Sequence, residues 1–266
     1  MTASLSEIDT LRLFHQFYET LKTQSDLSPN NQTINSVLTR LVGAIMQKNA
    51  AADTPFCEKV LKMSQFADAL RDICQAAEVE MEKYWAQKLA DTGTAGFDAL
   101  KQFIYFDNYN HITRGENDLI EKNGLPVKKV SFIGSGPLPM TAFILKNIRP
   151  NMRIKAIDQD PEAIRLSKNI NDTLDLGVDF IQASALDINY GAEDIVFVAS
   201  MTTDKIPLVK KLYDQGVAYI IMRDAEKFTR LLYEELNPEI FKFYSKKDFV
   251  FASQLTVNSS YLLKRK

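Results

Sequence analysis

Residues 130–141 have the sequence VSFIGSGPLPMT, and this segment decides the fold. A short apolar run leads to Gly134, and a stretch typical of a helix begins at Pro139. Glycines at 134 and 136 allow a tight turn and the close approach of a ligand, although a purely structural glycine turn is the alternative. The third glycine of a dinucleotide fingerprint is absent, and two prolines follow. The segment therefore favours a compact ligand with a carboxylate facing the helix N-terminus.

Strands and helices alternate after this segment. Strands are expected over residues 130–133, 153–157, 178–181, 194–199 and 218–222, and helices over 139–148 and 161–176. Such alternation implies a mainly parallel sheet covered on both faces. The runs 249–255 and 261–263 have no helix between them and predict an antiparallel hairpin at one edge. We predict an α/β fold, a Rossmann-like class I S-adenosylmethionine-binding domain.

The residues before this region have helical periodicity. Apolar residues recur at three- and four-residue spacing, as at Val37, Leu41 and Ile45, and a longer helix is expected over 66–90. We therefore predict an all-α helical domain over residues 1–125 and the Rossmann-like domain over 126–266. The helical domain is expected to form a lid over the nucleoside site and part of the acceptor site.

Composition and charge exclude several classes of function. The net charge of −2 gives no basic surplus for nucleic acid, and no apolar run reaches the length that spans a bilayer. The N-terminal residues lack the pattern of a secretory signal. Two cysteines without CxxC spacing and two histidines indicate buried thiols and no metal site. We expect a cytoplasmic protein without metal, and the sequence is compatible with a homodimer.

The loop after each predicted strand supplies candidate nucleoside-binding residues. Asp158 ends the second strand and is placed to accept hydrogen bonds from the ribose hydroxyls, whereas Asp160 before Pro161 is expected to cap a helix. A cap or turn role is the alternative for Asp158, and an ordinary loop or cap role for Ser200. The predicted S-adenosylmethionine contacts are Gly134, Ser135, Gly136, Pro137 and Leu138 in the glycine turn, Asp158 at the ribose, Ala183 and Ser184 at the adenine, and Ala199 and Ser200 beside the sulfonium and its tail.

A family resemblance rests on four segments of the sequence. They are GSGPLPMT at 134–141, FIYFDNY at 103–109 followed by Glu116, Met222-Arg223, and VNSS at 257–260. Together they resemble nicotianamine synthases and the related bacterial enzymes that build opine metallophores. The resemblance covers roughly residues 75–265, and residues 1–70 match only as a helical region.

The resemblance implies transfer of the 3-amino-3-carboxypropyl group of S-adenosylmethionine to an amine, with release of methylthioadenosine. Nicotianamine synthases act repeatedly on S-adenosylmethionine units, whereas the bacterial branch transfers one group to the α-amine of histidine. An opine dehydrogenase then condenses that product with a 2-oxo acid. The segment Tyr105-Phe106-Asp107-Asn108 and the chain's size favour the bacterial branch. Gly-Pro-Leu-Pro and Tyr109 also fit the nicotianamine branch, so a nicotianamine synthase is the alternative. A small-molecule methyltransferase and a non-catalytic binding module are the competing hypotheses.

The acceptor must be a free amine, so the reaction needs a general base. On the helix over 66–90, Glu80 falls on an apolar stripe, where a carboxylate is costly unless it is paired or functional. The resemblance also places a catalytic glutamate on this helix. Glu80 is therefore the predicted base, with Glu82 as the alternative if the helix register is shifted. A salt-bridged structural glutamate remains the competing interpretation.

The resemblance suggests five further residues. Tyr109 matches an active-site tyrosine and is predicted to be catalytic, and Tyr105 is predicted to face the donor. His111, Glu116 and Arg223 are candidate substrate contacts, Arg223 because its guanidinium can bind a carboxylate in bidentate fashion. Core packing for Tyr105, a structural role for His111, an exposed charge for Glu116 and a surface ion pair for Arg223 are the alternatives.

Overall fold

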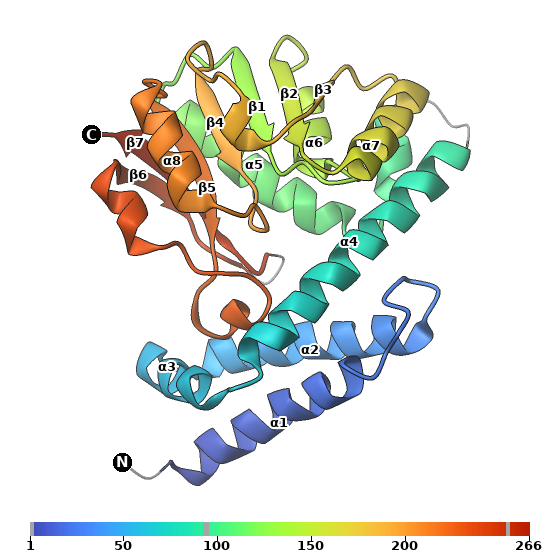
Figure 1. Ribbon diagram of the computed structural model, residues 1–266, viewed down its shortest axis with the longest axis vertical. Coiled ribbons are helices and arrows are strands. Elements are labelled where there is room, and N and C mark those ends of the chain that lie inside the picture. Colours follow the sequence, from blue (N-terminus) through green and yellow to red (C-terminus); the bar gives the residue numbers. More distant parts are fainter. Residues whose placement is uncertain (1–2, 93–95, 254–255) are drawn as a thin grey trace. The chain divides into compact units, whose positions relative to one another are not determined.

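The computed structural model describes residues 3–92, 96–253 and 256–266 of the chain and contains two compact units. The first unit comprises Met1–Met81 and Ala225–Glu235, and the second comprises Glu82–Asp224 and Leu236–Lys266. Figure 1 traces the chain through both. Within the described ranges, no helix combines the length and the apolar character that crossing a membrane requires.

The first unit is helical. Its helices are α1 Leu5–Leu21, α2 Gln32–Ala51, α3 Thr54–Met63, the first part of α4 Ala67–Asp91, and the short 3-10 helix η3 Lys227–Leu231. A polar side chain caps the start of each of the first three helices, namely Ser4, Asn31 and Asp53. The predicted apolar face of α2 is confirmed, because Val37, Leu41 and Ile45 are all buried.

Residues 225–235 complete the core of this first unit although they follow the fifth strand in sequence. The rings of Phe14 and Phe228 are fully buried, with centroids 5.0 Å apart. The Lys227 ammonium donates hydrogen bonds to the carbonyl oxygens of Asn49 and Ala52 at 3.0 and 2.7 Å. These bonds satisfy carbonyl groups at the end of α2 that have no partner within the helix.

The second unit contains a seven-stranded sheet in the order β3-β2-β1-β4-β5-β7-β6. Five strands are parallel, namely β1 Lys129–Ile133, β2 Arg153–Asp158, β3 Asp179–Gln182, β4 Ile195–Val198 and β5 Tyr219–Asp224. Strand β7 Ser259–Arg265 runs in the opposite direction and pairs antiparallel with β5 on one side and with the edge strand β6 Tyr244–Val250 on the other. This arrangement confirms the predicted α/β fold class.

Helices cover both faces of this sheet, which explains why every residue of its central strands β1 and β4 except Lys129 is buried (Figure 1). The helices are α5 Phe106–Lys122, α6 Met140–Ile148, α7 Pro161–Leu174 and α8 Lys205–Asp214, with the 3-10 helices η1 Phe97–Gln102, η2 Ala185–Asp187 and η4 Pro238–Lys242. Leu208, Val209 and Leu212 of α8 pack on one face. Helices α5 and α6 lie against each other and, as Figure 1 shows, on the opposite side from α8.

The terminal hairpin is confirmed, but its first strand is displaced from the prediction. The prediction was residues 249–255, whereas β6 spans Tyr244–Val250, and residues 254–255 lie outside the described part of the chain. Charged residues occupy the centre of β6, because an edge strand is exposed on one side and a bulge lies between Lys246 and Asp248. An apolar run was therefore the wrong signal for this strand.

The division of the sequence into two units differs from the single boundary predicted at residue 125. Helix α5 precedes that boundary but packs on α6, β6 and β7 of the second unit. The segment 225–235 follows the boundary but belongs to the first unit. The predicted lid role of the helical part stays a prediction.

Both cysteines are buried free thiols, and burial raises the pKa of Cys74 to about 12.

Candidate active site

The glycine turn after β1 is a corner in which two glycines combine positive φ angles with close side-chain neighbours. Gly134 and Gly136 adopt φ angles of 73° and 67°, in the left-handed region that favours glycine. A Cβ atom at Gly134 would lie 2.5 Å from Thr202 Oγ1, and one at Gly136 would lie 2.6 Å from Glu82 Oε2. Both distances are shorter than a van der Waals contact. Backbone conformation therefore favours glycine at both positions, and an added Cβ atom would also displace the side chain of Thr202 or Glu82.

Hydrogen bonds hold this corner on the end of β2. The backbone N–H groups of Gly134 and Ser135 both donate to the Ile157 carbonyl oxygen, at 2.9 and 3.1 Å. The Gly136 N–H donates to Asp158 Oδ2 at 2.8 Å. The corner is therefore attached to the strand that carries the predicted ribose ligand.

Asp158 is held on both of its carboxylate oxygens. Its Oδ1 accepts from the Asp160 N–H at 3.0 Å, in addition to the Gly136 contact on Oδ2. The Asp160 side chain caps α7 by accepting from the Glu162 N–H at 2.8 Å, as predicted. A carboxylate can accept about four hydrogen bonds. The half-buried Asp158 thus keeps acceptor capacity that suits ribose hydroxyls.

The other predicted nucleoside contacts follow β3 and β4, at the end of the sheet where the carboxyl ends of the parallel strands lie. The Ala183 N–H donates to the Asp158 carbonyl oxygen at 3.0 Å, and Ser184 caps η2 with its hydroxyl. The Ala199 N–H donates to the Ile133 carbonyl oxygen at 3.0 Å. The Ser200 carbonyl oxygen accepts from the Lys205 ammonium at 2.7 Å. Parallel strands end at one edge, so these loops surround a common site.

The rest of the glycine turn is closely packed. Ser135, Pro137 and Leu138 are buried, and Leu138 is only 1% exposed. Helix α6 begins directly afterwards at Met140, and no side chain caps its N-terminus. Backbone N–H groups of a first helical turn have no partner within their helix and suit an anion.

A carboxylate and a phenol meet beside the corner. The Tyr109 hydroxyl on α5 donates to Glu82 Oε1 at 3.1 Å, and Oε2 of the same carboxylate is the atom that faces Gly136. Glu82 is only 6% exposed. The Phe103 ring packs against Tyr105 and Tyr109, at centroid distances of 5.8 and 6.1 Å. The aromatic segment therefore positions Tyr109 on the carboxylate.

The expected register of α4 is wrong for Glu82. Sequence reasoning placed Glu80 on the inward stripe and Glu82 outside, but Glu82 is buried and Glu80 is half-buried. The reason is that α4 serves two cores. Its buried residues are Leu70, Cys74 and Ala77 in the first unit and Glu82, Trp85, Ala86 and Leu89 in the second. The second set is displaced by one residue, roughly 100° around the helix. Which of the two predicted glutamates is the base, Glu80 or its alternative Glu82, is not decided by burial.

Glu116 and Arg223 form an ion pair inside the second unit. The Arg223 guanidinium contacts both Glu116 oxygens, at 2.8 and 3.1 Å, and also Thr141 Oγ1 at 2.9 Å. The Ser260 hydroxyl donates to Glu116 Oε1 at 2.8 Å. Glu116 is 1% exposed. The pair thus links α5, α6, β5 and β7, and the predicted substrate contacts of both residues stay predictions.

His111 and Tyr105 occupy different surroundings on α5. His111 is exposed and lies two residues after Tyr109, so the two side chains leave the helix on different faces. Tyr105 is half-buried at the N-terminal end of the helix. Their predicted ligand contacts stay predictions. Among the described residues, no group of three or more His, Cys, Asp or Glu side chains could hold a metal ion.

Sequence reasoning missed Asn258 as a site residue. Its side-chain Nδ2 donates to Ser200 Oγ at 3.2 Å. The segment VNSS was noted only for its family resemblance. The available signal was position, because a residue that precedes an antiparallel strand beside β5 lies where the parallel strands end.

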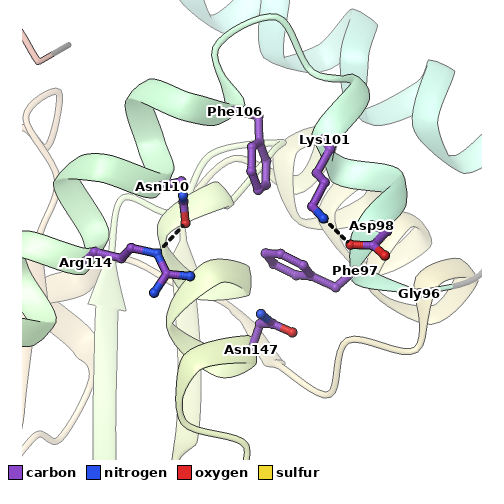
Figure 2. A pocket seen from close by; sticks show the side chains of 8 residues that line it. All are labelled: Gly96, Phe97, Asp98, Lys101, Phe106, Asn110, Arg114 and Asn147. Carbon is purple, nitrogen blue, oxygen red and sulfur yellow. Dashed lines mark hydrogen bonds and ion pairs between the residues drawn. The ribbon is translucent and has the colours of Figure 1, made fainter.

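A cavity with a volume of about 400 Å³ lies in this unit, away from the glycine corner. Figure 2 shows its lining, which comes from Gly96, η1, α5 and α6 and includes none of the glycine-corner residues. Its two cationic side chains have partners there: Lys101 pairs with Asp98 at 2.6 Å, and Arg114 donates to Asn110 at 3.1 Å. It is distinct from the nucleoside site.

Comparison with known proteins gives a match over nearly the whole chain. The family model described as nicotianamine synthase protein matches residues 7–266. Nicotianamine synthase of Solanum lycopersicum is 27% identical over 237 residues, which are 84% of this chain and 73% of that protein. Nicotianamine synthase-like 5 protein of Hordeum vulgare is 31% identical over 182 residues, 66% of this chain and 63% of its own.

Solved structures share the fold. MtNAS in complex with MTA and tNA superposes with a TM-score of 0.83 at 18% identity, over 100% of both chains. A Glu-to-Gln mutant of MtNAS superposes with a TM-score of 0.84 at 17% identity, over 99% of both chains. The likeness therefore extends through the helical part as well as the sheet.

The glycine corner can be tested with two matched substitutions. Gly124 has φ 63° and no atom within 4 Å of an added Cβ, whereas Gly136 has φ 67° and faces Glu82. Both Gly→Ala variants should lose about 1–2 kcal/mol of unfolding free energy to the left-handed backbone. Only Gly136→Ala should also lose about 100-fold in turnover with S-adenosylmethionine, because it displaces Glu82. Equal turnover of the two variants would contradict this account of the corner.

If the buried ion pair is structural, single and double variants of its two residues should differ in their free energy of unfolding. Arg223→Met leaves Glu116 buried without its cation and should cost about 3–5 kcal/mol in urea unfolding. The double variant Glu116→Gln/Arg223→Met should recover most of that loss, because no carboxylate remains uncompensated. As a control, Lys210→Met removes an exposed pair with Asp214 and should cost at most about 1 kcal/mol. A loss for Arg223→Met no larger than that of the control would exclude a structural role.

Proposed function

This chain belongs to the nicotianamine synthase family, and we propose that it transfers the 3-amino-3-carboxypropyl group of S-adenosylmethionine to the α-amine of histidine. The acceptor nitrogen forms a bond to the γ-carbon of the donor. The bond from that carbon to sulfur breaks, and its electron pair stays on sulfur, so that neutral methylthioadenosine leaves. The product is a secondary amine that carries one aminobutyrate unit.

The arrangement of Glu82 is the observation that carries this proposal. One carboxylate oxygen accepts from Tyr109 and the other faces the backbone of Gly136, at the edge of the sheet where the nucleoside candidates gather. A base there can take the proton that the attacking ammonium must lose. The Tyr109 hydroxyl fixes the orientation of the carboxylate. General-base assistance of this kind contributes about 10²–10⁴-fold to a rate.

The glycine corner supplies the donor site in this proposal. Asp158 accepts from the ribose hydroxyls, and the first turn of α6 faces the donor carboxylate. MtNAS, which has the same fold, has been crystallised with S-adenosylmethionine and with MTA. Those complexes support S-adenosylmethionine as the co-substrate here. The reaction requires that the γ-carbon, rather than the methyl group, lie in line with the acceptor nitrogen.

Histidine is proposed as the acceptor because Tyr105-Phe106-Asp107-Asn108 resembles the bacterial opine branch. In that branch the product passes to an opine dehydrogenase, which condenses it with a 2-oxo acid to complete a metallophore. The alternative acceptor is S-adenosylmethionine itself, as the plant relatives' names suggest. We also propose a cytoplasmic site of action, since free buried thiols suit a reducing compartment.

Product analysis tests the proposed reaction. Purified protein is incubated with S-adenosylmethionine and, in turn, L-histidine, D-histidine, other amino acids or no acceptor. Mass spectrometry should detect methylthioadenosine and histidine extended by one aminobutyrate unit. S-adenosylhomocysteine as the nucleoside product would show methyl transfer instead. Condensed S-adenosylmethionine units without any acceptor would show the nicotianamine reaction.

The base can be identified by the same substitution at two nearby positions of α4. Glu82→Gln should reduce turnover by about 10²–10⁴-fold, whereas Glu80→Gln should retain it. The deficit of Glu82→Gln should narrow as pH rises, because the acceptor amine then loses its proton in solution. The affinity of each variant for S-adenosylmethionine, measured by calorimetry, serves as the control for correct folding. The opposite ranking of the two variants would make Glu80 the base.

A further inference from the structure

Among the described residues of the second unit, four buried side chains carry an oxygen without a hydrogen-bond partner. Thr113 and Ser131 lie within α5 and β1, whereas Ser135, with its Oγ, and Asn258, with its Oδ1, lie beyond the ends of strands. Ser135 and Asn258 are only 5% and 7% exposed. A buried polar atom that makes no hydrogen bond costs about 1–3 kcal/mol. Such atoms in native proteins are therefore expected to have a ligand or water as their partner.

The topology brings both residues to the edge where the parallel strands end. Strand β7 is antiparallel to β5, with Ser259 opposite Asp224, so Asn258 precedes β7 at that edge. The Asn258 Nδ2 donates to Ser200 Oγ at 3.2 Å. Strands β1 and β4 pair with Ile133 opposite Val198, so Ser135 and Ser200 are each the second residue beyond paired positions. Asn258 thus joins the candidate nucleoside site through Ser200.

The free donor and acceptor capacities match the amino acid end of the donor. That end carries an ammonium group, which needs acceptors, and a carboxylate, which needs donors. The Asn258 Oδ1 can only accept a hydrogen bond, whereas the Ser135 hydroxyl can donate one. Hydrogen bonds to charged groups are shorter and stronger than those between neutral groups. The two side chains together suit a zwitterion.

We propose that Asn258 Oδ1 binds the α-ammonium, and the Ser135 hydroxyl the α-carboxylate, of the group that is transferred. This inference rests on the proposed function and extends it by assigning the site of the aminocarboxypropyl tail. Asn258 is then a positioning residue for the donor. By holding the far end of the tail, it sets where the γ-carbon lies relative to the acceptor nitrogen.

Two nucleosides that differ in the tail provide the test. S-adenosylhomocysteine carries the amino acid tail, whereas methylthioadenosine carries only a methylthio group in its place. Asn258→Leu should weaken binding of S-adenosylhomocysteine by about 10- to 100-fold and leave the affinity for methylthioadenosine unchanged. Asn258→Asp keeps an acceptor and should bind S-adenosylhomocysteine at least as tightly as the wild type. Asn151→Leu, at an exposed asparagine, is the control and should change neither affinity.

Isothermal titration calorimetry of the full chain measures the affinity of each of the three variants for both nucleosides. Equal weakening of both ligands by Asn258→Leu, or weakening of neither, overturns the proposal, because a purely structural residue cannot sense the tail. Asn258→Asp binding as poorly as Asn258→Leu also overturns it. If Asn258→Leu does not fold, Ser135→Ala provides the same two-ligand comparison. Neither ligand needs to react, so this test is independent of whether the wild type releases methylthioadenosine.

Discussion

The site depends on the close contact between one glycine and two carboxylates. The Gly136 N–H donates to Asp158, and a Cβ atom at this position would lie 2.6 Å from Glu82 Oε2 and displace that carboxylate. Asp158 is the proposed ribose ligand and Glu82 the proposed base. Gly136 therefore fixes the position of the proposed ribose ligand and of the proposed base relative to each other. A reaction that selects one of three carbons on a sulfonium needs such a fixed separation between donor and base.

The ion pair of Glu116 and Arg223 maintains this arrangement from a distance. Tyr109 and Glu116 are seven residues apart on α5, which places them on the same face of the helix two turns apart. By joining Glu116 to β5, α6 and β7, the pair fixes the rotation of α5 about its axis. That rotation directs the Tyr109 hydroxyl to Glu82. A buried pair two helical turns from Tyr109 thus orients the contact between Tyr109 and Glu82, the proposed base.

The sequence predicted the fold well because its signals are local. The glycine turn, the acidic strand end and the helix start at Asp160 each depend on a few neighbouring residues, and all were located correctly. Three features depend on distant parts of the chain and were not. Helix α4 changes its buried face because it serves two cores, and β6 is charged because it lies at an edge. The unit boundary differs because residues 225–235 return to the first unit. Periodicity within one segment contains no information about such partners.

The return of residues 225–235 has a consequence for biosynthesis. Phe14 packs on Phe228, so the core of the first unit is incomplete until most of the polypeptide has left the ribosome. Domains usually fold in order from the N-terminus during translation. This helical unit cannot complete its core until residues 225–235 are synthesised, and these follow five strands of the other unit in sequence. Its apolar helices remain uncovered during that interval. The sheet unit is likewise interrupted, so neither unit is an autonomous fragment that could be exchanged by recombination at a single crossover.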